Sequence, residues 1–158
     1  MSARPDHKDG AAEVTEFLWP VRVYYEDTDG GGVVYHANYL RFMERARTEW
    51  LRSLGFEQTE LRARDGILFV VHDMQLQFRK PARFNDELVV KSSLRKVGRS
   101  LLQFRQVILR GDTCMTEAIV DVVCIDAERF RPISIPAMIR QTITAAALYN
   151  SSDNMESQ

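Results

Sequence analysis

The sequence predicts an α+β fold in which one curved antiparallel sheet wraps around a single long helix. Three observations predict it: a strand-like run at 21–26, one strongly periodic helix between Asn38 and Gly55, and four further strand-like runs. One helix cannot bury its apolar stripe alone, and a sheet around it is the simplest cover. Such a sheet leaves edges unpaired, so we expect the chain to dimerise.

The first strand is predicted because residues 21–26 are rich in Val and Tyr. The helix is predicted by apolar side chains three and four residues apart, with Asn38 as its N-cap and Gly55 just after its end. Charged residues such as Arg45 and Glu49 fill the remaining helical positions. The apolar stripe consists of Tyr39, Phe42, Met43, Ala46, Trp50 and Leu54.

Four strand-like runs follow the helix, at about 67–79, 85–97, 100–111 and 117–126. In the first of them apolar and polar residues alternate, which indicates one buried and one polar face. The short links between the last three runs favour antiparallel hairpins over crossover connections. A short C-terminal helix is expected from about Pro136 to Tyr149, because proline suits a first helical turn.

Length and composition suit one soluble domain, since the 158 residues are 45% hydrophobic and 27% charged. We expect this domain over 17–149, between a disordered polar arm at 1–16 and a flexible tail at 150–158. The formal net charge of −1 argues against a nucleic-acid-binding protein. Because no signal-peptide core and no run of about 18 apolar residues occurs, we expect a cytoplasmic protein without a membrane span.

Cysteine and histidine usage predicts neither a metal site nor a bound cofactor. Cys114 and Cys124 lie in strand-like segments without a CxxC partner, so we expect two reduced core thiols. His7, His36 and His72 show no ligand spacing.

The segment 24–39 combines acidic residues, three successive glycines and a helix N-terminus. Glycines let another group approach the backbone closely. The first N–H groups of a helix lack intrahelical partners, so those near 35–37 suit the oxyanion of a tetrahedral intermediate. The ionised carboxylate of Asp29 can attack a carbonyl or activate a water, and His36 can hydrogen-bond either group. The pattern is therefore typical of acyl transfer.

The same residues also suit a purely structural interpretation. Asp27 and Asp29 can form Asx-type hydrogen bonds in a plain turn, and His36 can be a capping or packing residue. Glu44 and Glu49 are suited to solvated or ion-paired positions on the helix. From the residues alone, both interpretations stay open.

A long motif resembles a known family. Residues 21–39 read Val-Arg-Val-Tyr-Tyr-Glu-Asp-Thr-Asp-Gly-Gly-Gly-Val-Val-Tyr-His-Ala-Asn-Tyr, and 44–49 read Glu-Arg-Ala-Arg-Thr-Glu. This is similar to the Tol–Pal-associated acyl-CoA thioesterases (YbgC type) of the 4-hydroxybenzoyl-CoA thioesterase family. The resemblance runs from about Trp19 to about Pro136 and favours the catalytic interpretation. It implies a hotdog fold, with a five-stranded antiparallel sheet around one helix, and homodimers that often form homotetramers.

The resemblance also implies roles for individual residues. The catalytic carboxylate of the family maps to Asp29, either as nucleophile or as general base, and the N–H that polarises the carbonyl maps to His36. The side chains of Tyr25 and His36 are expected in the same site. The residues expected to bind substrate are Gly32, Val33, Val34, Tyr35 and, for the phosphates of coenzyme A, Arg99.

Arg99 lies in a basic hairpin at 95–100, and Arg79, Lys80 and Arg83 form a second basic cluster. Both clusters also suit solvated turns. The implied activity is hydrolysis of an acyl-CoA thioester in lipid metabolism, with acyl carrier protein as an alternative carrier.

Two other functions are compatible with the fold. A hotdog dehydratase would use His36 and Glu44 across a dimer interface, but the Asp-Thr-Asp-Gly block would then have no role. A non-catalytic module could hold an acyl carrier protein or an envelope partner, although the intact Asp29 and glycine turn argue against it. The acyl chain length is not predicted.

Overall fold

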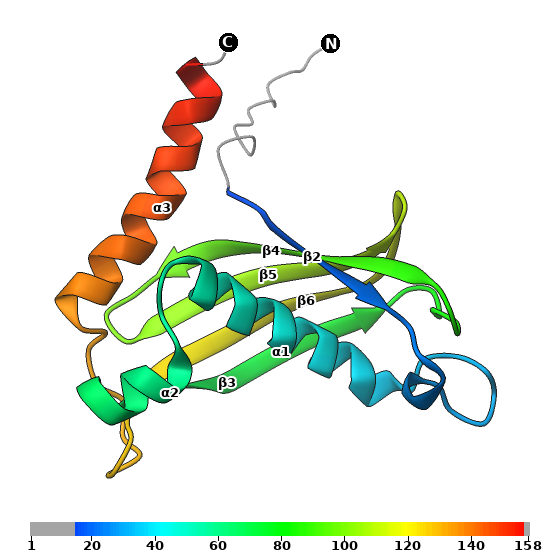
Figure 1. Ribbon diagram of the computed structural model, residues 1–158, viewed down its shortest axis with the longest axis horizontal. Coiled ribbons are helices and arrows are strands. Elements are labelled where there is room, and N and C mark those ends of the chain that lie inside the picture. Colours follow the sequence, from blue (N-terminus) through cyan, green and yellow to red (C-terminus); the bar gives the residue numbers. More distant parts are fainter. Residues whose placement is uncertain (1–14, 157–158) are drawn as a thin grey trace.

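A five-stranded antiparallel sheet curves around helix α1 in the computed structural model, which describes residues 15–156 (Figure 1). The strand order is β2-β4-β5-β6-β3, and every neighbouring pair is antiparallel. The α+β prediction, with five strands around one helix, is confirmed. The strands are β2 (Phe17–Arg22), β3 (Ile67–Phe78), β4 (Glu87–Val97), β5 (Leu101–Arg110) and β6 (Thr113–Asp126).

The first strand lies earlier in the chain than predicted. β2 ends at Arg22, and Tyr25–Asp27 forms a turn of 3-10 helix in place of strand. β2 pairs with β4 from Phe17 opposite Ser92 to Arg22 opposite Glu87, so the ladder is already complete at Arg22. The predicted strand at 21–26 was therefore wrong in its bounds, because pairing with β4 outweighs the local preference of Val and Tyr.

Helix α1 (His36–Ser53) starts before its predicted N-cap. Tyr35 is the N-cap residue, and Asn38 lies within the first turn. The predicted N-cap was therefore wrong. The side chain of Asn38 donates to the carboxylate of Asp27 instead of capping the helix. The apolar stripe packs on the sheet as expected: Tyr39, Phe42, Met43 and Ala46 are buried, and the Trp50 ring meets that of Phe104 edge-on, with centroids 5.1 Å apart.

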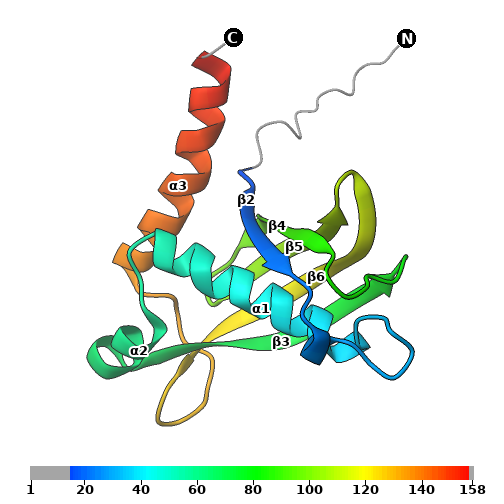
Figure 2. The ribbon, with the colours of Figure 1, turned by 45° about the vertical axis from the view of Figure 1, so that its right-hand side comes forward.

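The C-terminal helix α3 (Ala137–Glu156) has 20 residues and continues beyond Tyr149, into the segment for which the sequence predicted a flexible tail. Ile139 and Ile143 anchor its first half in the core, and the helix then extends away from the sheet (Figure 2). A short helical stretch, α2 (Gln58–Glu60) with the turn Leu61–Asp65, precedes β3 and was not predicted.

The expected N-terminal arm lies outside the described residues, except for Thr15 and Glu16. The Thr15 hydroxyl donates to the carbonyl of Ala147 at 3.0 Å, and the carboxylate of Glu16 lies 3.7 Å from the ammonium of Lys91. Between residues 15 and 156, no helix is long and apolar enough to cross a membrane.

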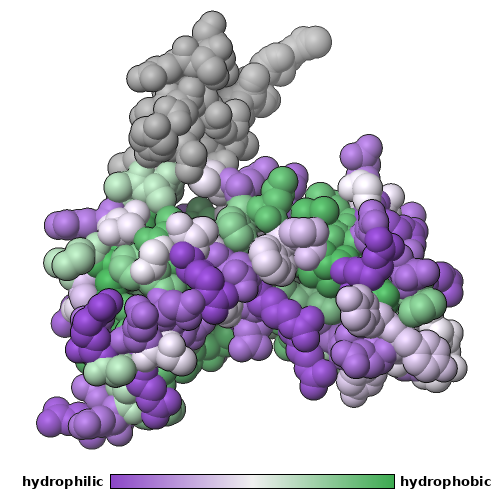
Figure 3. Space-filling model, viewed as in Figure 1, coloured by the Kyte–Doolittle hydropathy of each residue, from purple (hydrophilic) through white to green (hydrophobic). Residues whose placement is uncertain are grey.

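Strand β3 forms one edge of the sheet and pairs only with β6 within the described chain. It has 12 residues, and its Val71 and Phe78 side chains are 47% and 55% exposed. The face that carries α1 shows apolar side chains among polar ones (Figure 3). A long edge with exposed apolar residues is a surface on which another strand can pair.

Candidate active site

Asp29 lies at the start of a tight loop that leaves the 3-10 turn and returns to α1. Its Oδ1 accepts hydrogen bonds from the N–H of Gly31 at 2.7 Å and of Val33 at 3.4 Å. Its own N–H donates to the carbonyl of Val33 at 2.8 Å. The predicted Asx-type turn is therefore present, yet Oδ2 of this exposed carboxylate accepts no hydrogen bond from a described residue. The turn orients the carboxylate and leaves one oxygen available for chemistry.

Two of the three glycines favour this arrangement. A Cβ on Gly31 would lie 3.3 Å from Oδ1 of Asp29, which is tighter than an ordinary contact. Gly32 has a φ of +83°, a conformation that side chains disfavour. At Gly30, by contrast, a Cβ would meet nothing within 4 Å.

The start of α1 supplies free hydrogen-bond donors. The N–H of the N-cap residue Tyr35 donates to the carbonyl of Asp27 at 2.9 Å, and that of Asn38 donates to the carbonyl of Tyr35 at 2.8 Å. The N–H groups of His36 and Ala37 donate to no acceptor in the described chain. They lie at the positive end of an 18-residue helix, so they can stabilise a developing oxyanion.

The His36 imidazole is exposed, and its ring centroid lies 4.5 Å from that of Tyr35 and 6.5 Å from that of Phe78. It borders a shallow pocket of about 230 Å³ together with the basic residues Arg79 and Lys80. Tyr39 also lines this pocket. Burial raises the pKa of its hydroxyl, which accepts the N–H of Ala82 at 3.0 Å.

The other predicted site residues lie around the same loop. Val33 forms an antiparallel bridge with Arg83, and the buried Val34 donates its N–H to the carbonyl of Ala82 at 2.8 Å. Tyr25 is 79% exposed and packs edge-on against Phe84. The structure thus gathers at one end of α1 the residues Tyr25, Asp29, Gly32, Val33, Val34, Tyr35 and His36.

Arg99 does not reach this end within one chain. The carbonyl of Ser100 accepts the N–H of Cys124, which pairs with Phe69 near the start of β3, whereas His36 lies by Phe78 at the end of β3. β5 runs between the two ends, and the steps between its 10 residues, at about 3.4 Å each, span about 30 Å.

Of the second basic cluster, Arg79 and Lys80 do border His36. Arg79 is paired with Glu117, and this ion pair holds the pKa of the Glu117 carboxyl below its usual range. Lys80 forms no ion pair with a described residue. Lys80 is therefore the cation beside His36 that is available to a ligand.

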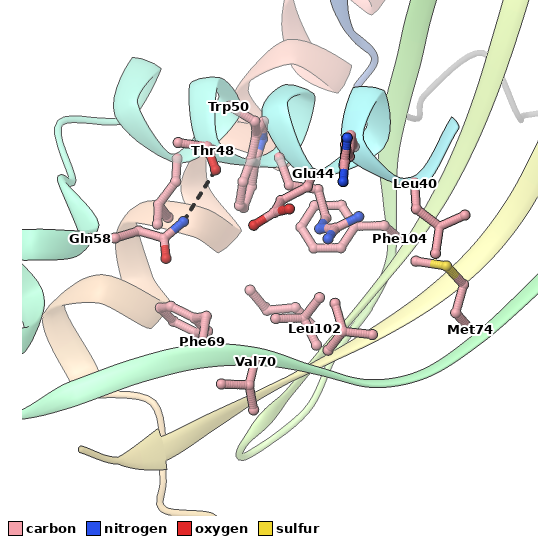
Figure 4. Close-up of a pocket in the computed structure, with 15 residues that line it drawn as sticks. Leu40, Glu44, Thr48, Trp50, Gln58, Phe69, Val70, Met74, Leu102 and Phe104 are labelled. Atoms are coloured by element: carbon pink, nitrogen blue, oxygen red, sulfur yellow. Dashed lines mark hydrogen bonds between the residues drawn. The ribbon is translucent and has the colours of Figure 1, made fainter. Parts of the chain in front are cut away.

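A larger pocket of about 520 Å³ lies between α1 and the strands β3, β5 and β6 (Figure 4). Apolar side chains from both layers point into it. It follows α1 from Leu40 to Leu51, a rise of about 16 Å along the helix axis at 1.5 Å per residue. Its apolar lining consists of Leu40, Trp50, Leu51, Phe69, Val70, Val71, Met74, Leu102, Phe104 and Val122.

Sequence reasoning missed that Arg47, at the wall of this pocket, is hydrogen-bonded to a buried polar residue that does not line the pocket. Arg47 donates through Nη1 to Oε1 of the buried Gln106 at 2.9 Å, and Gln106 donates to the hydroxyl of Ser92 at 2.9 Å. Burial lowers the pKa of the Arg47 guanidinium, and the nearby carboxylate of Glu44 opposes this shift. Arg47 stood out in the sequence only as part of the motif at 44–49, and no local signal showed that its side chain faces the sheet.

Glu44 points into the large pocket (Figure 4). It lies eight residues after His36 on α1, about 12 Å along the helix axis. The pair that a dehydratase would need is therefore not assembled within one chain. Among residues 15–156, no three His, Cys, Asp or Glu side chains are grouped so that they could hold a metal ion.

Comparison with known proteins identifies the family of this chain. The family model described as "Thioesterase superfamily" matches residues 31–115, which begin within the glycine turn, just after Asp29 and Gly30, and include α1 and β3. This chain belongs to the thioesterase superfamily. Its hotdog fold, predicted from the motif at 21–39, is confirmed.

Relatives and solved structures extend the match over most of the chain. An acyl-CoA thioester hydrolase YbgC of Escherichia coli O6:H1 is 45% identical over 126 residues, which are 79% of this chain and 93% of that protein. An acyl-CoA thioesterase YbgC of Haemophilus influenzae is 41% identical over 124 residues, 78% of this chain and 91% of that protein. The crystal structure of a probable thioesterase from Bartonella henselae is 36% identical, with a TM-score of 0.74 over 77% of this chain and all of that one.

Proposed function

We propose that this acyl-CoA thioesterase hydrolyses its substrate through Asp29, with the backbone N–H of His36 polarising the thioester carbonyl. One observation carries the proposal: the loop presents an exposed carboxylate with one unpaired oxygen and closes directly onto a helix start with unpaired N–H groups. A base or nucleophile and an oxyanion donor are the two groups that acyl transfer needs. The thioesterase family and the names of the relatives support the same reaction.

The reaction can follow two routes at this site. As a general base, Asp29 takes a proton from a water whose oxygen bonds to the carbonyl carbon. As a nucleophile, it bonds to that carbon itself, and water then cleaves the anhydride. In both routes the carbon–sulfur bond breaks, the thiolate of coenzyme A leaves and a proton returns to it. The side chains of His36 and Tyr25 are exposed at the site and can hydrogen-bond the leaving group.

We place the acyl group in the large pocket between α1 and β3, which begins one turn after the helix N-terminus (Figure 4). A mainly apolar lining of about 16 Å suits an extended apolar acyl group better than acetyl. Thiol release from a panel of acyl-CoAs of increasing length tests both the activity and this position. Release from none of them would remove the proposed function and favour a binding module.

The proposal includes a homodimer, or a homotetramer built from such dimers, formed through the β3 edge. Two β3 strands that pair antiparallel across a two-fold axis run in opposite directions. The basic hairpin at 95–100 of one subunit then lies near the His36 end of the other subunit. In this arrangement Arg99 of the partner subunit joins Lys80 in binding the phosphates of coenzyme A.

The phosphate contacts predict a selective loss of binding. Lys80→Ala and Arg99→Ala are each expected to raise KM for acyl-CoA several-fold, because each removes a cation that would bind phosphate. The same variants should hydrolyse the matching acyl-pantetheine, which lacks the nucleotide, as wild type does. Steady-state kinetics with both substrates checks this. An equal rise in KM with both substrates would contradict the proposal that Lys80 and Arg99 bind the phosphates.

The glycine turn gives a second prediction, for Gly31, with the preceding Gly30 as the control. Gly31→Ala is expected to lower kcat about tenfold or more, since its Cβ would displace the Asp29 carboxylate that lies 3.3 Å away. Gly30→Ala, where a Cβ meets nothing within 4 Å, should keep the wild-type rate. Equal rates for the two variants would show that the carboxylate need not be held in this position.

The cellular setting remains a proposal that rests on the resemblance. We place the enzyme in the cytoplasm, in lipid metabolism and in association with the Tol–Pal envelope system. Thioesters of acyl carrier protein, tested beside acyl-CoA in the same assay, would identify the carrier.

A further inference from the structure

Asp27, the first acid of the Asp-Thr-Asp block, is buried between the loop that it begins, which runs to His36, and the first turn of α1. It is 6% exposed. Its Oδ2 accepts the N–H of Tyr24 at 2.8 Å, and its Oδ1 accepts Nδ2 of Asn38 at 2.7 Å. Its carbonyl also accepts the N–H of Tyr35 at 2.9 Å. One residue therefore binds the chain that enters the loop, the chain that leaves it, and the helix.

The two acids of the block thus have different environments. Asp29 is exposed and keeps an unpaired oxygen, whereas both oxygens of Asp27 are hydrogen-bonded away from solvent. Asn38 is equally buried, at 6% exposed. Asp27 is therefore unsuited to activating a water. Its hydrogen bonds instead connect the two ends of the loop to α1.

The loop between Asp27 and His36 contains three successive glycines, which by themselves permit many conformations. The Asp27–Asn38 hydrogen bond closes this loop from the inside, and the bridge between Thr28 and Val34 closes it from the backbone. These two closures join the segment that carries Asp29 to the segment that leads into the His36 N–H, and so bear on the relative position of the two groups. An error of about 1 Å in such a position can cost about 100-fold in rate.

We propose that Asp27 and Asn38 form a clamp that sets the distance between the Asp29 carboxylate and the N-terminus of α1, so that Asp27 is a positioning residue of the reaction. This inference rests on the proposed function. The clamp needs one side chain that accepts the hydrogen bond and one that donates it. If both residues are changed together, position 27 can donate and position 38 can accept.

An exchange of the two side chains tests the clamp. Asn38→Asp alone places two carboxylates against each other and is expected to lower kcat at least tenfold, with a smaller change in KM. Adding Asp27→Asn to the same chain restores a donor–acceptor pair, since the amide now at position 27 can still accept from Tyr24 and donate to the carboxylate now at position 38. The exchanged pair should recover most of the wild-type kcat. Asn38→Ala, which removes the donor without adding charge, is expected to lower kcat as well.

Ser92→Ala is the matched control for a purely structural role. It removes a different buried hydrogen bond, from Gln106 to the Ser92 hydroxyl at 2.9 Å, below α1 and away from the loop. It should lower the melting temperature and leave kcat at 25 °C unchanged. Each rate is measured per folded protein, with the folded fraction taken from circular dichroism.

Three results would overturn the clamp: wild-type kcat in Asn38→Ala, no recovery in the exchanged pair, or an equal kcat loss in Ser92→Ala. These results are separate from a failure of the proposed function. If Asp29→Asn lost activity while Asn38→Ala kept it, the catalytic assignment would stand and the clamp would not. If Asp29→Asn remained active, both would fall.

Discussion

Replacing Asp29 by Asn is expected to lower kcat for acyl-CoA hydrolysis by at least about 100-fold, because the amide can neither take a proton from water nor attack the carbonyl. The fold should be retained. The Asn side-chain oxygen can still accept the N–H of Gly31, which is the 2.7 Å bond that shapes the loop. A thiol-reactive dye that follows release of coenzyme A, with both proteins at saturating substrate, measures the change.

The control for this variant is Asp65→Asn, another exposed aspartate, outside the loop between Asp27 and His36. It should match wild type in rate and melting temperature. An unchanged rate in Asp29→Asn would remove Asp29 from the mechanism. Turnover in water labelled with heavy oxygen tests the nucleophilic route. Label in the Asp29 side chain would show a nucleophile whose anhydride water opens at the aspartyl carbon, whereas a general base, or an anhydride opened at the acyl carbon, places the label only in the product acid.

Phe42→Ala is expected to lower the free energy of unfolding by about 3–5 kcal/mol. Phe42 is fully buried on the face of α1 that meets the sheet, and its ring packs edge-on against Tyr39 with centroids 6.4 Å apart. The substitution removes buried apolar surface and leaves a cavity that the surrounding strands cannot fill completely. Urea unfolding followed by circular dichroism measures the loss.

Leu40→Ala provides the comparison on the same helix. Leu40 is 38% exposed and lies at the pocket rather than in the core. Its truncation should therefore cost clearly less than that of Phe42. Equal losses for the two variants would mean that the wrong face of α1 had been assigned to the core.

Most of the fold and part of the site could be predicted from neighbours along the chain. The period of α1 identified its buried face, and the short links between the later strands identified the antiparallel hairpins. The glycine turn and the helix start pointed to Asp29 and His36, because an Asx turn and free helical N–H groups form within a few residues.

Other features depend on residues that are far apart in sequence. β2 stops at Arg22 because its ladder with β4 is complete there, and no local preference contains that information. The large pocket, with Arg47 bonded to Gln106 across 59 residues, exists only where α1 and the sheet face each other.

By itself, the sequence determined the fold class, the helix that carries the site, and the motif around Asp29 that resembles thioesterases. The resemblance already pointed to Asp29 rather than Asp27, but only the tertiary structure showed how their surroundings differ: Asp27 is buried and hydrogen-bonded, whereas Asp29 is exposed. The tertiary structure also decided that Lys80 lies beside His36 while Arg99 lies at the far end of the sheet. The physical reason is that turns and helical faces arise from adjacent residues. Burial and proximity arise from strand pairing and packing between distant segments.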